Sequence, residues 1–530
     1  MSRRFDRGTG LSALAMAVAI GLPGGAMAAQ GSSWGSAGGD RQNTRSQPSE
    51  HTLGVGNVSR LAVKWSLTTA GDVSATPAVD EDTVYVPDWA GYLYAVNRQT
   101  GALRWKVAVS ALTGVPGDKA RATPALAGDK VIIGTQGSIL AGGGPGGRVL
   151  ALNKATGALV WSTVAESHPA AIITQSATVH GSQVFVGVAS QEEALAAFAP
   201  GYVLSFRGSM LSLDVNTGKV IWKTMLAPTG YTGNSVWGSS PAVDTKRGSV
   251  YVATGNNYSV PPAVLSCVAS ASSDAARAAC LPGDDYFDSI LSLDIKTGAV
   301  RWATRAISYD AWTVACIFGG GDNCPSPAGP DYDFGQAPAL FKATGGKGAP
   351  VELVGAGQKS GQYWALDADT GAVAWVTQAG PGGTTGGLQW GSATDGTRVY
   401  TADSNSNFVP WTPLGQSAPT VRGAWSGIDA LTGQLLWQTV DPNDAAGIGG
   451  GPSGPVTTAN GVVYACSLDA LGTMYAMDAA SGAILWRYAS GGSCLSGAAI
   501  ADGTLFWGSG YSNFGFGTPN HKLYAFSLPD

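Results

Sequence analysis

The stretch Tyr363-Trp-Ala-Leu-Asp-Ala-Asp-Thr-Gly-Ala-Val-Ala-Trp375 decides the fold, because its pattern recurs along the whole chain. An alternating apolar segment leads to an Asp-x-x-Thr-Gly turn, and a second segment ends on tryptophan. Alternation with period two is typical of a β-strand with one buried face, and glycine supplies the positive φ of a tight loop. The stretch therefore predicts a β-hairpin that ends on a tryptophan.

Seven copies of this hairpin are complete. Besides 363–375 they occupy residues 93–105, 149–161, 210–222, 290–302, 425–437 and 474–486. An eighth copy is divided between the ends of the chain, with the tryptophan-ending strand at Leu61–Trp65 and its preceding strand at Lys522–Leu528. Joining the two halves closes a ring and removes exposed sheet edges. We predict an all-β, eight-bladed β-propeller over residues 51–530, closed by the N- and C-terminal strands, with each repeat tryptophan packed between blades.

The composition agrees with a large, turn-rich β protein. The 530 residues are 44% apolar and 13% charged and include 76 glycines, without the period of collagen. The net charge is −5 and no basic patch stands out, so we expect no nucleic-acid partner.

The N-terminus has the pattern of a cleaved secretory signal. Arginines within the first seven residues precede an apolar run from Leu11 to Leu22 and then Ala26-Met-Ala28. The run is short for a membrane anchor, so we predict a signal peptide over 1–28, no membrane span and a periplasmic protein. Residues 29–50 are polar and rich in glycine and serine, which favours a flexible lead-in.

The six cysteines predict disulfides, because their number is even and the expected compartment is oxidising. Pairing of sequence neighbours is the simplest of 15 connectivities and would join 267 to 280, 316 to 324 and 466 to 494. No Cys-x-x-Cys-His motif for covalent haem is present, and the four histidines are too scattered for a zinc site.

Polar side chains occupy the entries and exits of successive blades, positions that can converge on the axis of a propeller. They are Arg121, Thr174, Glu192, Asn256, Asp331, Asp333 and Lys359. Carboxylate and amide oxygens are the ligands that calcium prefers, and arginine and lysine bind anions. Two insertions, Pro261–Asp288 and Ser404–Arg422, are expected to build the rim of a binding surface.

From about Leu53 to the C-terminus, the chain resembles the PQQ-dependent alcohol dehydrogenases, which are eight-bladed quinoproteins. Ile173-Thr174-Gln175, followed by Glu192, resembles the stretch whose threonine contacts the quinone and whose glutamate ligates the metal. Glu193 is an adjacent candidate for that ligand. The strand ending in Gly-Asn256 resembles one that supplies a second metal ligand. The segment Ser-Val-Trp237-Gly resembles the one whose tryptophan stacks under the quinone.

The same resemblance implies the catalytic residues. The segment Asp331-Tyr-Asp333-Phe resembles the one that supplies the catalytic base, and counting to the following Pro-Ala-Leu favours Asp331 over Asp333. A second aspartate at this spacing is similar to lanthanide-dependent members, where it adds a metal ligand, and it also occurs in calcium members. Lys359 and Arg121 match residues that bond the quinone oxygens. Gln389 and Trp390 align loosely with a further cofactor-binding segment, so the resemblance adds these two residues to the site.

Two departures from the family pattern concern the cofactor site. The ring formed by adjacent cysteines is missing before Arg121, and Ser74 stands where many relatives have glutamate. Phrases at 86–95, 235–248 and 323–331 are similar to the polyvinyl alcohol dehydrogenase branch.

The resemblance implies an enzyme that depends on PQQ and on Ca²⁺, with a lanthanide ion as the alternative metal. Its expected reaction is the oxidation of secondary alcohol groups, foremost those of polyvinyl alcohol. Without a fused cytochrome, it would pass electrons to a separate cytochrome c. The alternatives are a PQQ dehydrogenase for another secondary alcohol or a sugar, and a scaffold propeller without enzymatic activity.

Overall fold

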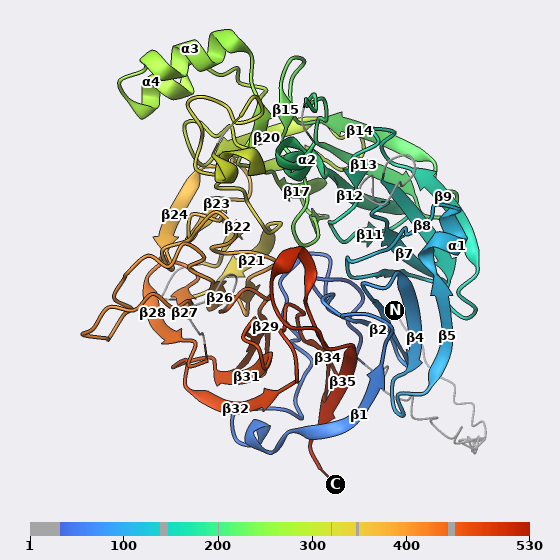
Figure 1. Ribbon diagram of the computed structural model, residues 1–530. Coiled ribbons are helices and arrows are strands. Elements are labelled where there is room, and N and C mark those ends of the chain that lie inside the picture. Colours follow the sequence, from blue (N-terminus) through green and yellow to red (C-terminus); the bar gives the residue numbers. More distant parts are fainter. Residues whose placement is uncertain are drawn as a thin grey trace, which may run out of the picture. The chain divides into compact units, whose positions relative to one another are not determined.

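The computed structural model describes residues 32–137, 147–199, 201–319, 321–345, 349–443 and 451–529. Within these ranges the strands form eight antiparallel sheets arranged in a ring, which Figure 1 shows end on. The predicted eight-bladed propeller is therefore confirmed. The expected signal peptide at 1–28 lies outside the described residues.

The first four blades follow one another along the chain. Their strands are β2 (Ala78–Val79), β3 (Thr83–Pro87), β4 (Tyr92–Asn97) and β5 (Leu103–Ala108); β6 (Ala125–Ala127), β7 (Lys130–Gly134), β8 (Arg148–Asn153) and β9 (Leu159–Val164); β10 (Ala171–Ile172), β11 (Thr178–His180), β12 (Gln183–Ser190), β13 (Ser209–Asp214) and β14 (Val220–Met225); and β16 (Ala242–Asp244), β17 (Ser249–Ala253), β19 (Ser289–Asp294) and β20 (Val300–Arg305). In the third blade both β10 and β11 pair with β12. A separate two-stranded sheet joins β15 (Thr232–Gly233) to β18 (Asn257–Ser259).

The other four blades complete the ring. Their strands are β21 (Ala339–Ala343), β22 (Val351–Gly357), β23 (Gln362–Asp367) and β24 (Val373–Gln378); β25 (Ala393–Thr394), β26 (Arg398–Asp403), β27 (Ala424–Asp429) and β28 (Leu435–Val440); β29 (Thr457–Ala459), β30 (Val462–Cys466), β31 (Thr473–Asp478) and β32 (Ile484–Ala489); and β33 (Ala499–Ala501), β34 (Thr504–Ser509), β35 (Lys522–Ser527) and β1 (Ala62–Thr68). Pairing of β1 with β35 closes the ring, with Ala62 opposite Ser527 and Thr68 opposite Lys522.

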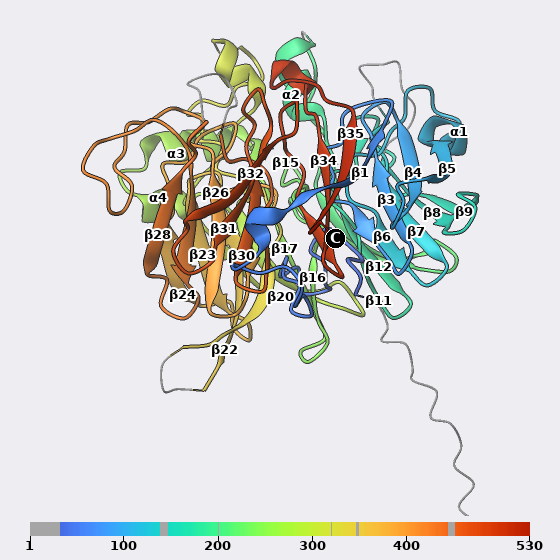
Figure 2. The ribbon, with the colours of Figure 1, turned by 90° about the horizontal axis from the view of Figure 1, so that it is seen from below.

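Short helices precede the first strand or lie in the connections between strands. They are η1 (Val58–Arg60), α1 (Val109–Thr113), α2 (Glu192–Phe198), α3 (Pro262–Ser270), α4 (Asp274–Ala278), η3 (Val314–Phe318) and η4 (Asn513–Gly515). Figure 2 shows α2 at one end of the ring, above the strands in that view. No helix in these ranges has the length and apolar character needed to cross a membrane.

Side-chain hydrogen bonds and the close approach of a tryptophan ring explain the sequence of the Asp-x-x-Thr-Gly turn. Asp367 Oδ1 accepts from the N–H of Thr370 at 2.9 Å and from its hydroxyl at 2.8 Å. Gly371 then adopts a φ of 73°, and a Cβ there would lie 2.6 Å from the Trp302 ring. Glycine is therefore required both for the backbone conformation and for the approach of the preceding blade's tryptophan.

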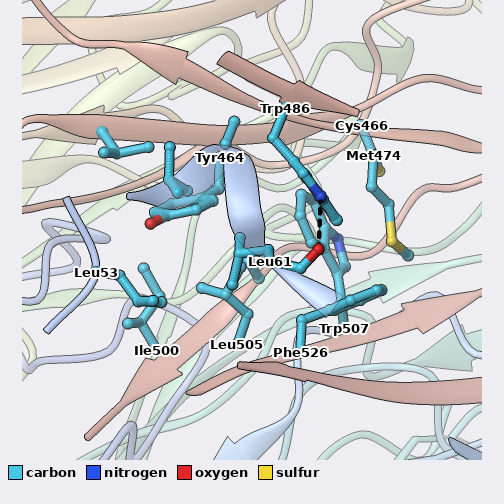
Figure 3. Close-up of a cluster of buried hydrophobic side chains, with 14 of the residues drawn as sticks. Leu53, Leu61, Tyr464, Cys466, Met474, Trp486, Ile500, Leu505, Trp507 and Phe526 are labelled. Atoms are coloured by element: carbon cyan, nitrogen blue, oxygen red, sulfur yellow. Dashed lines mark hydrogen bonds between the residues drawn. The ribbon is translucent and has the colours of Figure 1, made fainter. Parts of the chain in front are cut away.

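The repeat tryptophans connect neighbouring blades, as predicted. Trp161 is buried on β9, an outer strand whose neighbouring side chains are largely exposed. Its Nε1 donates to Val215 O of the next blade at 2.9 Å. At the seam, Trp486 Nε1 donates to Leu61 O at 3.0 Å, the dashed line in Figure 3. Leu61 packs there beside Trp507, so the last complete repeat holds the N-terminal strand in the ring.

Residues 32–50 are packed, whereas their composition led us to expect a flexible lead-in. The backbone of this segment accepts hydrogen bonds from the first strands of several blades. They include Val79 N to Trp34 O, Leu126 N to Gly35 O, Val243 N to Arg41 O, Leu340 N to Gln42 O, Thr394 N to Thr44 O and Thr458 N to Arg45 O, all at 2.7–2.9 Å. The segment thus satisfies the free edges of the inner strands, a pairing that composition does not reveal.

Three disulfides join the cysteines as sequence neighbours, which confirms the simplest of the possible pairings. They link Cys267 to Cys280, Cys316 to Cys324 and Cys466 to Cys494. The first ties α3 to the segment after α4 in the insertion 261–288, and the second encloses part of η3. Both therefore stabilise loops rather than the blades.

Candidate functional site

One cavity of about 390 Å³ gathers most of the predicted site residues. Each comes from a loop next to a short inner strand or at the end of a longer one. They are Arg121, Thr174, Trp237, Asp331, Asp333, Lys359, Gln389 and Trp390. The loops converge because the ring brings corresponding ends of the blades together. The structure therefore places residues from five blades around one space.

A buried lysine lies between two aspartates in the lining of this cavity. Lys359 Nζ is 2.8 Å from Asp331 Oδ1 and 3.3 Å from Asp333 Oδ2. Burial lowers the pKa of Lys359, but the facing carboxylates outweigh it and leave that pKa well above the usual value. Burial also raises the pKa of Asp331, and Lys359 opposes this effect only in part. The lysine thus stays protonated and forms an ion pair with Asp331, whose raised pKa makes its carboxylate a stronger base.

Asp331 has a strained backbone that a neighbouring carboxylate supports. Its φ is 61°, in the left-handed region that few residues other than glycine adopt. Asp310 accepts from the N–H of Asp331 at 3.2 Å and from the N–H of Tyr332 at 2.7 Å. Asp310 could not be selected from the sequence, because it lies outside every motif that points to the site. Its role in the loop is visible only once the loop is folded.

Asp333 fixes the position of Trp237, an aromatic residue that lines the cavity. Its Oδ2 accepts from Trp237 Nε1 at 3.0 Å, and its Oδ1 accepts from the N–H of Asn256 at 2.6 Å. Trp237 also meets Trp390 edge to face, with ring centroids 5.2 Å apart. Thr174 Oγ1 donates to Trp237 O at 3.0 Å. The indole is therefore fixed by hydrogen bonds and packing before any ligand arrives.

Glu192 does not line the cavity, although we selected it as a metal ligand. Its carboxylate is fully buried and accepts from Phe206 N at 2.8 Å and from Ser205 N at 3.0 Å. It also accepts from the Tyr202 hydroxyl at 3.0 Å, and His168 Nε2 lies 3.2 Å away. Burial raises its pKa, but these hydrogen bonds outweigh burial and lower it overall. Glu192 therefore fastens α2 to the loop that follows it.

Glu193, the adjacent candidate, faces the cavity instead. One step along α2 turns a side chain by about 100°, so neighbouring glutamates point in different directions. Burial raises the pKa of Glu193 to about 7, with Lys359 opposing and Asp333 adding to the shift. Three carboxylates, from Glu193, Asp331 and Asp333, thus share this part of the cavity with one ammonium group.

Asn256 lies behind Asp333, and its amide orientation is fixed. Nδ2 donates to Asn257 O at 3.0 Å and to Trp312 O at 2.9 Å, which directs the amide oxygen the other way. In the described part of the chain, no three carboxylate, imidazole or thiol groups are arranged to hold a metal ion without movement. Lys359 lies between the carboxylates of Asp331 and Asp333 and helps to keep them apart.

Arg121 forms the positive side of the cavity. Its guanidinium lies 4.6 Å from the centre of the Trp390 ring and 5.1 Å from that of Trp89. Burial lowers its pKa, and within the described ranges it has no carboxylate partner. An arginine held against aromatic rings without a counter-charge is suited to binding an anion. Gln389 is buried beside it on the same wall.

Apolar side chains that the sequence did not reveal stand where the cavity meets the surface. Ile317, on η3, lines the cavity and is 53% exposed. Next to it, Phe318 packs on Phe198 of α2 with ring centroids 5.6 Å apart, and both rings remain more than 60% exposed. The two helices come from separate blades, so only the folded ring brings these residues together.

Comparisons with known proteins agree with this fold. The protein family described as outer membrane protein assembly factor BamB matches residues 55–304 and 421–512, which together exceed half of the chain. The polyvinylalcohol dehydrogenase of Sphingopyxis sp. (strain 113P3) is 29% identical over 90% of this chain and 73% of its own. A polyvinylalcohol dehydrogenase of Pseudomonas sp. is also 29% identical, over 93% of this chain and 73% of its own.

A solved structure shows the same architecture. The quinohemoprotein alcohol dehydrogenase of Comamonas testosteroni superimposes with a TM-score of 0.66 over 94% of this chain and 80% of its own. At 19% identity this likeness concerns the fold. The chemistry therefore has to be argued from the cavity.

Proposed function

We propose that the propeller of this chain, which belongs to the family described as outer membrane protein assembly factor BamB, has a catalytic cavity. In this proposal the protein acts as a PQQ-dependent alcohol dehydrogenase. The observation that carries the proposal is the buried group of Lys359, Asp331 and Asp333 beside the fixed indole of Trp237. A scaffold that binds partner peptides has no need of such a group. Burying these charges is costly, so a function has to account for them.

The residues present fit the cofactor and a metal ion. PQQ is a planar, anionic quinone, and the cavity offers it a flat indole at Trp237 and the guanidinium of Arg121, which has no carboxylate partner among the described residues. Carboxylates outnumber the ammonium group three to one around Lys359, and a cation would balance that excess. Oxygen donors of this type suit Ca²⁺, and lanthanide ions share the preference for oxygen.

The metal ligands that we propose are Glu193, Asn256, Asp331 and Asp333. Glu193 replaces Glu192 in this set, because the carboxylate of Glu192 is engaged by four residues outside the cavity. Calcium remains our first choice, with a lanthanide as the alternative that the second aspartate would favour. A bound cation acts as a Lewis acid toward oxygen atoms of a ligand.

The side chains divide the work of alcohol oxidation. Asp331 accepts the hydroxyl proton of the alcohol, a general-base task for a carboxylate whose pKa is raised. Lys359, which stays protonated, stabilises negative charge that develops on the cofactor oxygens, together with Arg121. PQQ, when bound, supplies the carbonyl group that accepts hydride from the alcohol carbon. Trp237 and Trp390 exclude water from one side of the reacting groups.

We propose secondary alcohol groups as the substrate, and polyvinyl alcohol as the foremost compound. Relatives that match nine-tenths of this chain carry that activity in their names. The exposed apolar rim of Ile317, Phe318 and Phe198 offers a surface on which the hydrocarbon backbone of a polymer can rest beside the cavity. A small secondary alcohol or a sugar is the alternative, for which the rim would have no use.

The proposed setting is the periplasm, with a separate cytochrome c as electron acceptor. Three disulfides within the described residues fit an oxidising compartment. The signal sequence expected at 1–28 supports the same location.

The proposal can be tested with purified apo-protein. PQQ would be added with Ca²⁺ or with La³⁺, and dye reduction would be followed with polyvinyl alcohol and with propan-2-ol. We expect activity that requires both PQQ and a metal ion, and faster turnover of the polymer's hydroxyl groups. Failure to bind PQQ with either metal would contradict the proposal and favour the scaffold function.

A further inference from the structure

A buried arginine occupies the N-terminal segment that runs along the inner strands. Arg45 is 1% exposed and has a φ of 52°, an uncommon conformation for a residue other than glycine. Its N–H donates to Gly38 O and its carbonyl accepts from Thr458 N, both at 2.9 Å. The backbone is therefore held in a strained state that directs this one side chain inward.

The guanidinium of Arg45 has neutral partners only. Nε donates to Val456 O at 2.7 Å, Nη1 to Ala37 O at 2.5 Å and Nη2 to Thr76 Oγ1 at 3.0 Å. Among the ion pairs of the described residues none involves Arg45. Burial lowers its pKa to about 9, with no acidic group to oppose the shift. A buried charge without a counter-charge is costly, so an anion nearby would stabilise the fold.

Space for such an anion exists beside this guanidinium. A cavity of about 50 Å³ is lined by both Arg45 and Arg121. Hydroxyl groups make up much of the remaining polar lining, and no carboxylate contributes to it. They belong to Ser74, Thr76, Thr123, Thr174, Ser176 and Ser239. This volume suits one small ion or a few waters.

Two glycines leave room for the guanidinium at this position. A Cβ at Gly497 would lie 2.3 Å from Arg45 Nη2, and one at Gly391 would lie 2.8 Å from Arg45 Cδ. Side chains at either position would displace the arginine. The two glycines therefore accommodate the arginine side chain of Arg45. Filling an apolar gap would not require this arrangement.

We propose that this cavity is an anion-binding site in which Arg45 and Arg121 together hold a single negative charge with the help of the surrounding hydroxyl groups. The ligand is a small anion of the halide or carboxylate type. Two sources can supply it: a free halide, or a carboxylate of the cofactor in the neighbouring catalytic cavity. The second source rests on the proposed function, because Arg121, Thr174, Trp390 and Leu495 line both cavities.

The first experiment uses bromide as the probe and needs no cofactor. Apo-protein would be melted in sodium bromide and in sodium gluconate at equal ionic strength. For a protein of this length we expect bromide at a hundred times its Kd to raise Tm by about 2–3 °C. The variant Arg45→Gln should lose this response. Arg98→Gln is the matched control, because Arg98 is equally buried but is paired with Asp502 at 2.8 Å.

A second measurement does not depend on how the variants fold. Crystals of the wild-type protein grown in sodium bromide should show an anomalous peak between Arg45 and Arg121. Absence of that peak, together with equal bromide responses in wild type, Arg45→Gln and Arg98→Gln, would overturn the proposal.

Adding PQQ then identifies the source of the anion. If the site holds a cofactor carboxylate, bromide should raise the apparent Kd for PQQ at least several-fold in wild type but not in Arg45→Gln. If it holds a free halide, the bromide peak should persist in crystals that contain PQQ. Either result supports the site. A protein that binds bromide but no PQQ would refute the proposed function and leave the anion site in place.

Discussion

The two adjacent glutamates at the start of α2 should have opposite effects when each is changed to glutamine. Glu193 faces the cavity, where burial and the neighbouring aspartates raise its pKa to about 7 from the usual 4.5. At about 1.4 kcal/mol per pKa unit, Glu193→Gln should stabilise the apo-protein at pH 8 by about 3 kcal/mol. Because it removes a proposed metal ligand, it should also lower kcat/KM by at least about 100-fold.

Glu192→Gln should do the reverse. Two backbone N–H groups, of Ser205 and Phe206, donate to this buried carboxylate, and glutamine turns an N–H group toward one of them. Hydrogen bonds to a charged acceptor contribute about 1.5–3 kcal/mol each, so we expect a loss of about 2–4 kcal/mol of stability. Turnover per folded molecule should change little, because the carboxylate does not reach the cavity.

Urea unfolding at pH 8 and at pH 5, and steady-state kinetics with PQQ and Ca²⁺, measure both effects. The stabilisation by Glu193→Gln should largely vanish at pH 5. An acid whose folded pKa is raised loses stability as pH rises from the unfolded toward the folded pKa, and the penalty is small below that range. Loss of turnover in Glu192→Gln at unchanged stability, with full activity in Glu193→Gln, would refute this placement of the metal ligand.

Three other substitutions test the proposed base, a buried acid of β26 and the apolar rim of the cavity. With Ca²⁺ in excess, Asp331→Asn should still bind PQQ in a calorimetric titration but lower kcat by about 100- to 10,000-fold, and unchanged turnover would end its assignment as the base. Asp403 is buried, which raises its pKa to about 7, so this group should lower wild-type stability as pH rises from 4 to 7. Asp403→Asn should therefore make the fall in urea-unfolding stability over this range less steep than in wild type, and an unchanged slope would contradict the prediction. Phe318→Ser should raise KM for polyvinyl alcohol several-fold and leave KM for propan-2-ol unchanged, whereas equal effects on both substrates would exclude a role of the rim in holding a polymer.

The fold could be predicted from the sequence because its determinants are local and repeated. Asp367, Thr370 and Gly371 form their turn with one another, and the tryptophan that follows needs only the next turn. The same reasoning located the seam, since the unpaired halves of one repeat lie at 61–65 and 522–528. Seven complete copies left little freedom for another architecture.

The lead-in was harder to interpret. Its glycine and serine content is that of a mobile segment, yet residues 34–45 bond to the inner strands of several blades. Those strands are too short to show their unpaired edges in the sequence. Arg45 therefore gave no signal, because its partners are backbone carbonyls and a hydroxyl group that are distant along the chain.

The candidate site was predicted in part. Family resemblance selected eight residues that the structure brings to one cavity, including Lys359 and Trp237. It also selected Glu192, where the one-residue choice between neighbours depends on how α2 is rotated. Asp310 and the rim residue Phe318 escaped notice, since their roles come from contacts between blades rather than from motifs.

The central claim is that this cavity holds PQQ beside a metal ion. Isothermal titration of the apo-protein with PQQ, in the presence and absence of Ca²⁺, tests it most directly. We predict one PQQ per chain, with an affinity that falls at least tenfold without the metal and again in Lys359→Ala. Absence of binding in both conditions, or binding that neither Ca²⁺ nor Lys359 influences, would contradict the claim.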